Sequence, residues 1–128
     1  MPFSNFTTIS AYSRKQAIED GVLIDITAAA TDHGFKLHTV VTDNLYHAYL
    51  NPPDDLLETH GQSFDGRLHD LLHMAYLAAK KSKGQSRIEF EVLFLMAPGK
   101  HEKVTVIAHV GPGDDPAPVL TLMLPGDD

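Results

Sequence analysis

The residues of this 128-residue chain whose types and spacing most resemble a known catalytic site are two histidines, His69 and His73. Four residues apart, they lie on one face of a helix, as do the histidines of an H-E-x-x-H zinc motif. Asp70 stands where that motif has its glutamate base, and a catalytic zinc also needs a third ligand. The candidates for that ligand are His101, His109 and Asp114. Alternatively, both rings only flank the buried stripe of the helix, with their stems packed and their tips in water.

A second possible chemistry is acid–base cleavage of RNA, which needs a base, an acid and a cation on one surface. Arg87, Glu89 and Glu91 alternate along a predicted strand, and His109 lies on the next strand. Their outward positions place these side chains on one face of a sheet. Outward charges on strands are also found simply solvated or paired with a neighbouring strand. The sequence therefore predicts no catalytic residue, and a small enzyme remains the alternative, either a metal-dependent hydrolase or a ribonuclease.

The segment 111–116 contains two glycines but also two prolines and two acidic residues, and a strand is predicted to follow it. A phosphate site favours exposed N–H groups and a following helix, so this segment is predicted to be a rigid hairpin loop. We expect the exposed positions of the loop and of the outward sheet face to form an interaction surface. Its predicted residues are Arg87, Glu89, Glu91, Thr105, His109, Asp114 and Asp115.

The composition narrows the class of protein. Ten basic and 17 acidic residues give a net charge of −7, which argues against binding to a nucleic-acid backbone. The chain has no cysteine, which excludes disulfides and thiolate-bound metals. Its apolar runs fall short of the ~20 residues that span a bilayer, and residues 1–10 carry no secretory signal pattern. We expect a cytoplasmic protein without a cofactor.

The elements that position these residues begin with short helices. The first twelve residues read as an irregular arm of a single domain covering residues 1–128. Ser13, Thr27 and Thr42 are candidate N-caps. They would begin helices over residues 14–20 and 28–33 and a third segment that ends at residues 51–53. Residues 22–26 read as extended.

One long helix is predicted from about Ser63 to Lys81, because apolar residues recur there at intervals of three and four. After Gly84 the period changes to two, which predicts strands over residues 87–96, 103–110 and 119–124. Short connections between them favour an antiparallel arrangement. The predicted fold is α+β, with N-terminal short helices and one long helix packed on a C-terminal three-stranded antiparallel meander.

Several segments resemble a family of small uncharacterised proteins found mainly on bacterial plasmids, phages and integrative elements. The resemblance lies in residues 13–27, 34–35, 61–62, 66–72, 74, 111–115 and 122–127. It implies a context, namely accessory genes of mobile elements that often lie beside genes countering host defence, but no activity. The family has bulky aromatic residues where His69 stands, so the resemblance gives no support for a ligand role of that histidine.

Together these features predict a non-enzymatic accessory protein that binds a protein partner. A subunit of a host defence complex is the expected partner, which would make the protein an inhibitor of the anti-CRISPR or anti-restriction type. An open sheet face or edge strand also makes a homodimer an expected form of self-association.

Overall fold

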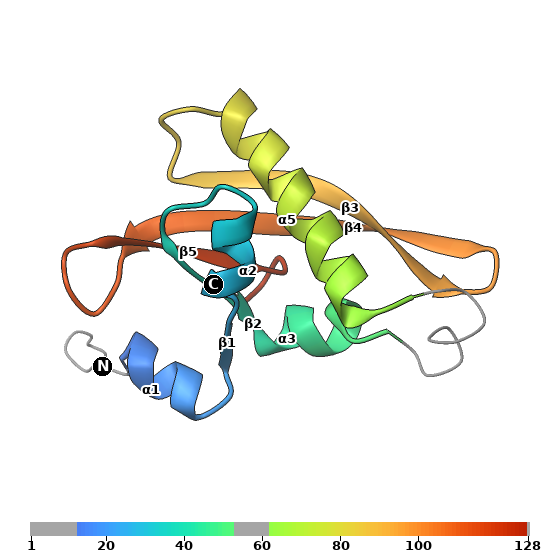
Figure 1. The fold of residues 1–128 in the computed structure, drawn as a ribbon, viewed down its shortest axis with the longest axis horizontal. Coiled ribbons are helices and arrows are strands. Elements are labelled where there is room, and N and C mark those ends of the chain that lie inside the picture. Colours follow the sequence, from blue (N-terminus) through green and yellow to red (C-terminus); the bar gives the residue numbers. More distant parts are fainter. Residues whose placement is uncertain (1–12, 53–61, 128) are drawn as a thin grey trace.

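A computed structural model describes residues 13–52 and 62–127 of the chain. The elements, in chain order, are α1 (Arg14–Glu19), β1 (Leu23–Asp25), α2 (Thr27–Asp32), β2 (His38–Thr42), α3 (Asp43–Leu45), the π-helical turn η1 (Tyr46–Leu50), α5 (Phe64–Lys81), β3 (Arg87–Ala97), β4 (Lys100–Pro112) and β5 (Pro118–Met123). Figure 1 shows α5 crossing one side of a sheet. The predicted arm over residues 1–12 lies outside the described residues.

The sheet has five strands in the order β1-β2-β5-β4-β3. The prediction of a three-stranded antiparallel meander is therefore wrong. The three predicted strands are present, and β3, β4 and β5 pair antiparallel. The sheet continues beyond β5, however, because β2 pairs with it in parallel and β1 adds an antiparallel edge. The α+β class stands, with a mixed sheet.

The missing strand β2 gives no alternating signal in the sequence. Four of its five residues are buried, from Thr39 to Thr42, because β2 lies inside the sheet between β1 and β5, on the side where α2 and α5 cross it. A short strand buried on both faces cannot be distinguished by periodicity from a buried helical segment. Its parallel partner β5 lies about eighty positions further along the chain, so no local turn marks the pairing.

The core lies between α5 and the sheet, as the helical stripe predicted. Leu68, Leu71, Leu72 and Ala75 are buried against Phe90, Val92, Val104 and Val106 of the two longest strands. Ser63 begins the helix as predicted, because its hydroxyl accepts a hydrogen bond from the amide of Gly66 at 3.0 Å.

The short helices begin close to the predicted residues. Ser13 accepts from the amide of Gln16, and Thr42 accepts from the amide of Leu45. Thr27 differs, since it is the first residue of α2 rather than its cap. The Asp25 carboxylate accepts from both the amide and the hydroxyl of Thr27, at 2.9 and 2.6 Å, and so takes over the local hydrogen bonding.

A buried arginine joins α5 to the far end of β3. Arg67 is only 2% exposed, and it donates to the carbonyl oxygens of Tyr49 and Leu95 and to the side chain of Gln62. Its guanidinium lies 5.7 Å from the centre of the Phe94 ring. Burial lowers the pKa of Arg67. The side chain thus satisfies carbonyl groups next to the irregularity between Leu95 and Ala97.

Candidate functional site

The histidine pair predicted as a metal site lies on α5, with its two rings parallel and their centres 6.2 Å apart. Its nearest described histidine is His33, whose Nε2 atom lies 2.8 Å from Nδ1 of His69. His33 also contacts the carbonyl oxygen of Ala29. Among residues 13–52 and 62–127, no group of three or more His, Asp or Glu side chains is placed to hold a metal ion. A metal role for His69 and His73 stays a prediction.

Five of the seven predicted interaction residues share the sheet face opposite α5. Arg87 pairs with His109 and Glu91 with Thr105 across β3 and β4. Glu89 lies between the first two pairs, and the residues alternating with it point into the core. The structure therefore brings together the outward set that the period of two indicated.

The other two predicted residues, Asp114 and Asp115, lie in the loop between β4 and β5 and hold local structure. Asp114 accepts from the amides of Arg14 and Lys15 at 2.7 and 3.0 Å, which caps α1 from a distant part of the chain. These two bonds lower the pKa of Asp114. Asp115 accepts from the amide of Ala117 within its own loop.

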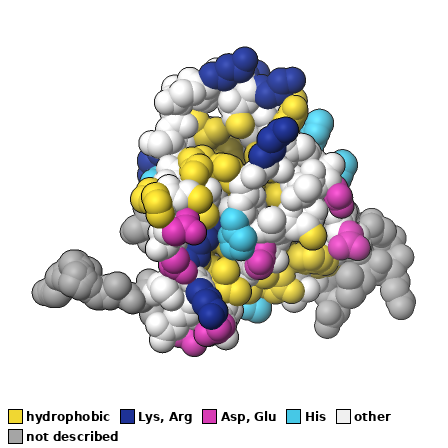
Figure 2. Space-filling view, turned by 60° about the vertical axis from the view of Figure 1, so that its left-hand side comes forward, with side chains coloured by type: hydrophobic (Ala, Val, Ile, Leu, Met, Phe, Trp, Pro, Cys, Tyr) yellow, Lys and Arg dark blue, Asp and Glu magenta, His cyan; other side chains and the backbone are white. Residues whose placement is uncertain are grey.

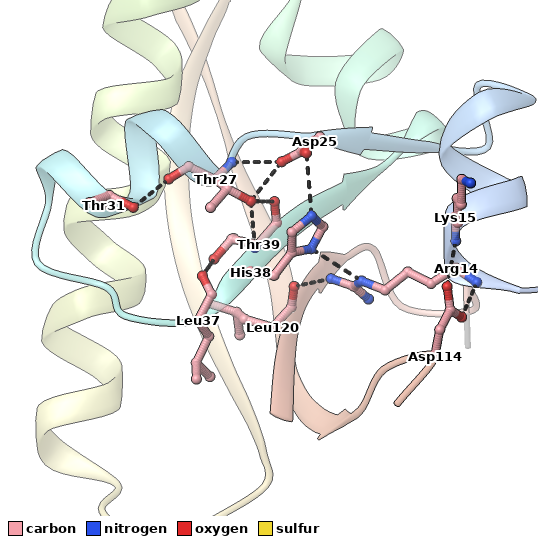
Figure 3. Close-up of polar contacts among 10 residues, drawn as sticks. All are labelled: Arg14, Lys15, Asp25, Thr27, Thr31, Leu37, His38, Thr39, Asp114 and Leu120. Carbon is pink, nitrogen blue, oxygen red and sulfur yellow. Dashed lines mark hydrogen bonds and ion pairs between the residues drawn. The ribbon is translucent and has the colours of Figure 1, made fainter. Parts of the chain in front are cut away.

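A polar network beside α1 joins this helix to β1, β2 and β5 (Figure 3). His38, which begins β2, places Nε2 3.3 Å from the Asp25 carboxylate and Nδ1 3.5 Å from Nε of Arg14. The Arg14 guanidinium donates to the Leu120 carbonyl oxygen and the Thr121 hydroxyl, both at 2.9 Å. Its position between β2 and β5 ties α1 to the sheet.

This network borders an open cleft of about 720 Å³ between α1, the start of β2 and the β4–β5 loop. Acidic, basic and histidine side chains are interspersed on this side of the molecule (Figure 2). Partial burial raises the pKa of Asp25, but the two Thr27 bonds and the nearby His38 outweigh it and leave that pKa lowered. Burial lowers the pKa of Arg14, against the opposing effect of Asp114 and Asp25. The charged groups of the network contact one another, and these contacts hold α1 against the sheet.

Most of the exposed large apolar side chains lie elsewhere, on α5 and β3. Four large hydrophobic residues of the described chain are exposed, and three of them lie on α5 or β3: Met74 (36%), Leu77 (41%) and Leu93 (58%). Met74 and Leu93 line one groove of about 400 Å³, together with Asp70 and Glu91. Leu77 follows Met74 by one helical turn. The fourth residue, Val22, precedes β1 at the other side of the sheet.

Among the described residues, no strand pairs with the side of β3 that lies next to this groove. Within the described part of the chain, β3 pairs with β4 alone. The Val110 amide donates to the Ser86 carbonyl at 2.7 Å, which sets the alternation of the ladder. Since successive residues of a strand point their N–H and C=O groups in opposite directions, those of Glu89, Glu91 and Leu93 point away from β4. We call Asp70, Met74, Leu77, Glu89, Glu91 and Leu93 the β3 edge surface.

Comparison with known proteins gives a family but no activity. A family described as a family of unknown function, DUF6573, matches residues 1–128. The chain belongs to this family. No curated protein and no solved structure matches the chain. Membership in DUF6573 agrees with the expected resemblance to uncharacterised proteins, whereas the expected origin on mobile elements stays a prediction.

Sequence reasoning missed several residues that organise this DUF6573 chain. The Asp25-x-Thr27 spacing carries a local signal, because Asp side chains often bond the amide two residues on. Arg67 carries another, since it falls three residues after Phe64, on the buried stripe of α5. Arg14 and His38 carry none, because their partners are distant in sequence. In the described segments, no helix has the length and apolar character needed to cross a membrane.

Proposed function

We propose that this protein is a non-enzymatic binding domain that holds a protein partner at the β3 edge surface. The observation that carries the proposal is the groove beside β3 that the exposed residues Met74 and Leu93 both line. Contiguous exposed apolar side chains bordered by polar residues are typical of protein-binding sites. The predicted residues Glu89 and Glu91 belong to the same surface.

The nature of the partner and its location complete the proposal. A subunit of a host defence complex in the cytoplasm is the partner class that the family resemblance implies. The net charge of −7 supports a protein over a nucleic acid as the bound molecule.

A comparison of two matched variants tests this function. Tagged wild-type protein, Leu93→Lys and Val22→Lys are each expressed in the natural host and purified with their bound proteins. Both substitutions place a lysine at an exposed apolar position, but only Leu93 belongs to the β3 edge surface. We expect a stoichiometric partner with wild type and Val22→Lys and at least a tenfold loss with Leu93→Lys. Equal recovery by all three, or recovery of no partner, contradicts the proposed function.

A ribonuclease is the second candidate, favoured by the direct pairing of Arg87 with His109 and the position of Glu89 on the same face. These three residues supply a cation, an acid and a base. Incubation with a mixed RNA pool tests this candidate, and His109→Ala is the control variant. If the wild-type protein cleaves the RNA and His109→Ala does not, a ribonuclease is supported. If the RNA pool stays intact, this candidate is excluded.

A further inference from the structure

We propose that the β3 edge surface binds an extended segment of its partner as an added strand, and that this segment alternates apolar and basic residues. The inference rests on the proposed function, because it names the binding mode and the partner chemistry of the same surface. Three observations carry it: the free backbone groups of β3, the groove beside α5 and the charges around both.

The free backbone groups give the binding mode. Glu89, Glu91 and Leu93 each direct an N–H and a C=O away from β4, at the spacing of every second residue. An extended peptide that lies beside β3 would pair with these groups as a sixth strand. Main-chain bonds of this kind supply affinity in strand addition, and side chains at alternate positions supply specificity.

The groove gives the apolar half of the pattern. It is bordered by Met74 of α5 and by Val92 and Leu93 of β3. Every second side chain of an added strand would point to the α5 side of the sheet, next to Met74 and Val92. Apolar side chains at these positions would remove this exposed apolar surface from water.

The charges give the basic half. Glu89 and Glu91 are exposed on the other side of the sheet, and Asp70 borders the groove. Lys103 and His73 also line the groove, and Nζ of Lys103 lies 3.9 Å from Glu91 with both side chains mostly exposed. A contact this exposed is weak, so it leaves the Glu91 carboxylate accessible to a cation of the partner. Lysine or arginine opposite the two glutamates would be attracted, since opposite charges across a ladder stabilise pairing.

The same charges disfavour one register of a second copy of this chain on β3. Antiparallel pairing of two β3 strands over the stretch from Arg87 to Leu93 is centred on Phe90. That register places Glu89 of each chain opposite Glu91 of the other. Like charges directly opposite each other destabilise a strand pair.

Peptide binding to the full-length chain tests the inference. The probe is a fluorescein-labelled peptide of seven residues that alternates valine and lysine, and binding is followed by fluorescence anisotropy. The controls are the same peptide with glutamate in place of lysine, and a block peptide with the valines first and the lysines last. We expect the alternating lysine peptide to bind at least tenfold more tightly than either control. Equal binding of the block peptide overturns the inference, because it reduces the effect to net charge.

Two variants separate strand addition from simple charge attraction. The double variant Glu89→Lys/Glu91→Lys is expected to reverse the preference, so that the glutamate peptide binds more tightly, which a misfolded chain would not do. Glu91→Pro removes one outward N–H and is expected to weaken the lysine peptide at least tenfold. An unreversed preference in the double variant, or wild-type affinity in Glu91→Pro, overturns the inference.

Two further measurements show whether the added-strand model or the proposed function is wrong. A dimer of the free wild-type chain in light scattering that Glu91→Pro converts to monomer also overturns the inference, because the second copy then occupies the edge. If the peptide tests fail while Leu93→Lys still loses the cellular partner, strand addition is removed and the proposed function stands. If Leu93→Lys keeps the partner, the proposed function itself is removed.

Discussion

The two edge strands of the sheet, β1 and β3, differ in how far other parts of the chain protect their outer backbone groups. At one edge, β1 has only three residues, and its approach is tied to α1 by the bond from the Val22 amide to the Ala17 carbonyl at 2.9 Å. Asp25 at its end is held by Thr27 and His38. At the other edge, β3 has eleven residues, and Leu93 beside it is the most exposed of the large hydrophobic side chains described.

This difference indicates where the molecule is suited to binding. Proteins usually protect their edge strands by shortness, by charges or by a covering element, because a free edge pairs with other chains. The β1 edge uses shortness and α1. The β3 edge is long, and its two outward glutamates, Glu89 and Glu91, discourage pairing with acidic strands and favour basic ones. We therefore describe β1 as the protected edge and propose β3 as the binding edge.

The largest expected effect comes from proline scanning along β3. Val92→Pro removes a bond to β4 and a buried side chain, and is expected to cost about 3 kcal/mol or more of the free energy of unfolding. Glu91→Pro, one residue earlier, removes only an outward N–H and is expected to cost less than about 1 kcal/mol. Urea denaturation measures both. Similar losses would show that both sides of β3 are paired in the free chain, and would break the comparison of the two edges.

A smaller loss is expected from Arg67→Ala, which removes the side chain that fixes the far end of the binding edge. It leaves the carbonyl groups of Tyr49 and Leu95 without this donor, and we expect a cost of roughly 2–4 kcal/mol. Lys100→Ala, at the exposed first residue of β4, is the control and should change stability by less than about 0.5 kcal/mol. A loss below about 1 kcal/mol for Arg67→Ala in urea denaturation contradicts the structural role given to it.

The stability that the protected edge gains from Asp114 should decrease in acid. Because the folded-state pKa of Asp114 is lowered from 3.8, its contribution to stability is present above that pH and is lost as the pH falls through the folded pKa. We expect Asp114→Asn to lower the unfolding midpoint in urea at neutral pH. The difference from wild type should shrink below pH 3.8. Asp115→Asn, whose carboxylate bonds only within its loop in the contacts described, should show the smaller effect at neutral pH. A difference that grows in acid would contradict the capping of α1 by Asp114.

The smallest effect is expected from Leu93→Lys on stability. The side chain is mostly exposed, so the free energy of unfolding should change by less than about 0.5 kcal/mol. Thermal unfolding with circular dichroism measures it, with Val22→Lys as the matched control at the other edge. A loss above about 1 kcal/mol would assign Leu93 to the packing of the domain rather than to binding.

The sequence predicted what is encoded locally. The caps at Ser13, Thr42 and Ser63 were found because a cap acts on amides two or three residues away. The stripe of α5 and the alternation of β3 and β4 were found because burial on one face repeats with the period of the element. The same alternation placed Arg87, Glu89 and His109 on one face.

The remainder depends on contacts between distant segments. The parallel pairing of β2 with β5 and the tether from Arg14 to Leu120 join residues with no common sequence signal. Asp114 was predicted to belong to an interaction surface, yet it binds the start of α1 a hundred residues away. The apolar part of the β3 edge surface was missed because the exposure of Met74 and Leu77 on α5 depends on how the helix packs on the sheet.

Amide hydrogen exchange along β3 tests the central claim most directly. In the free chain, the amides of Glu89, Glu91 and Leu93 should exchange rapidly, while those of Phe90 and Val92 are protected by β4. With the alternating lysine peptide bound, the first three should slow at least tenfold and the other two should change little. Protection of all five amides in the free chain, or no change in the first three on binding, would contradict the assignment of β3 as the binding edge.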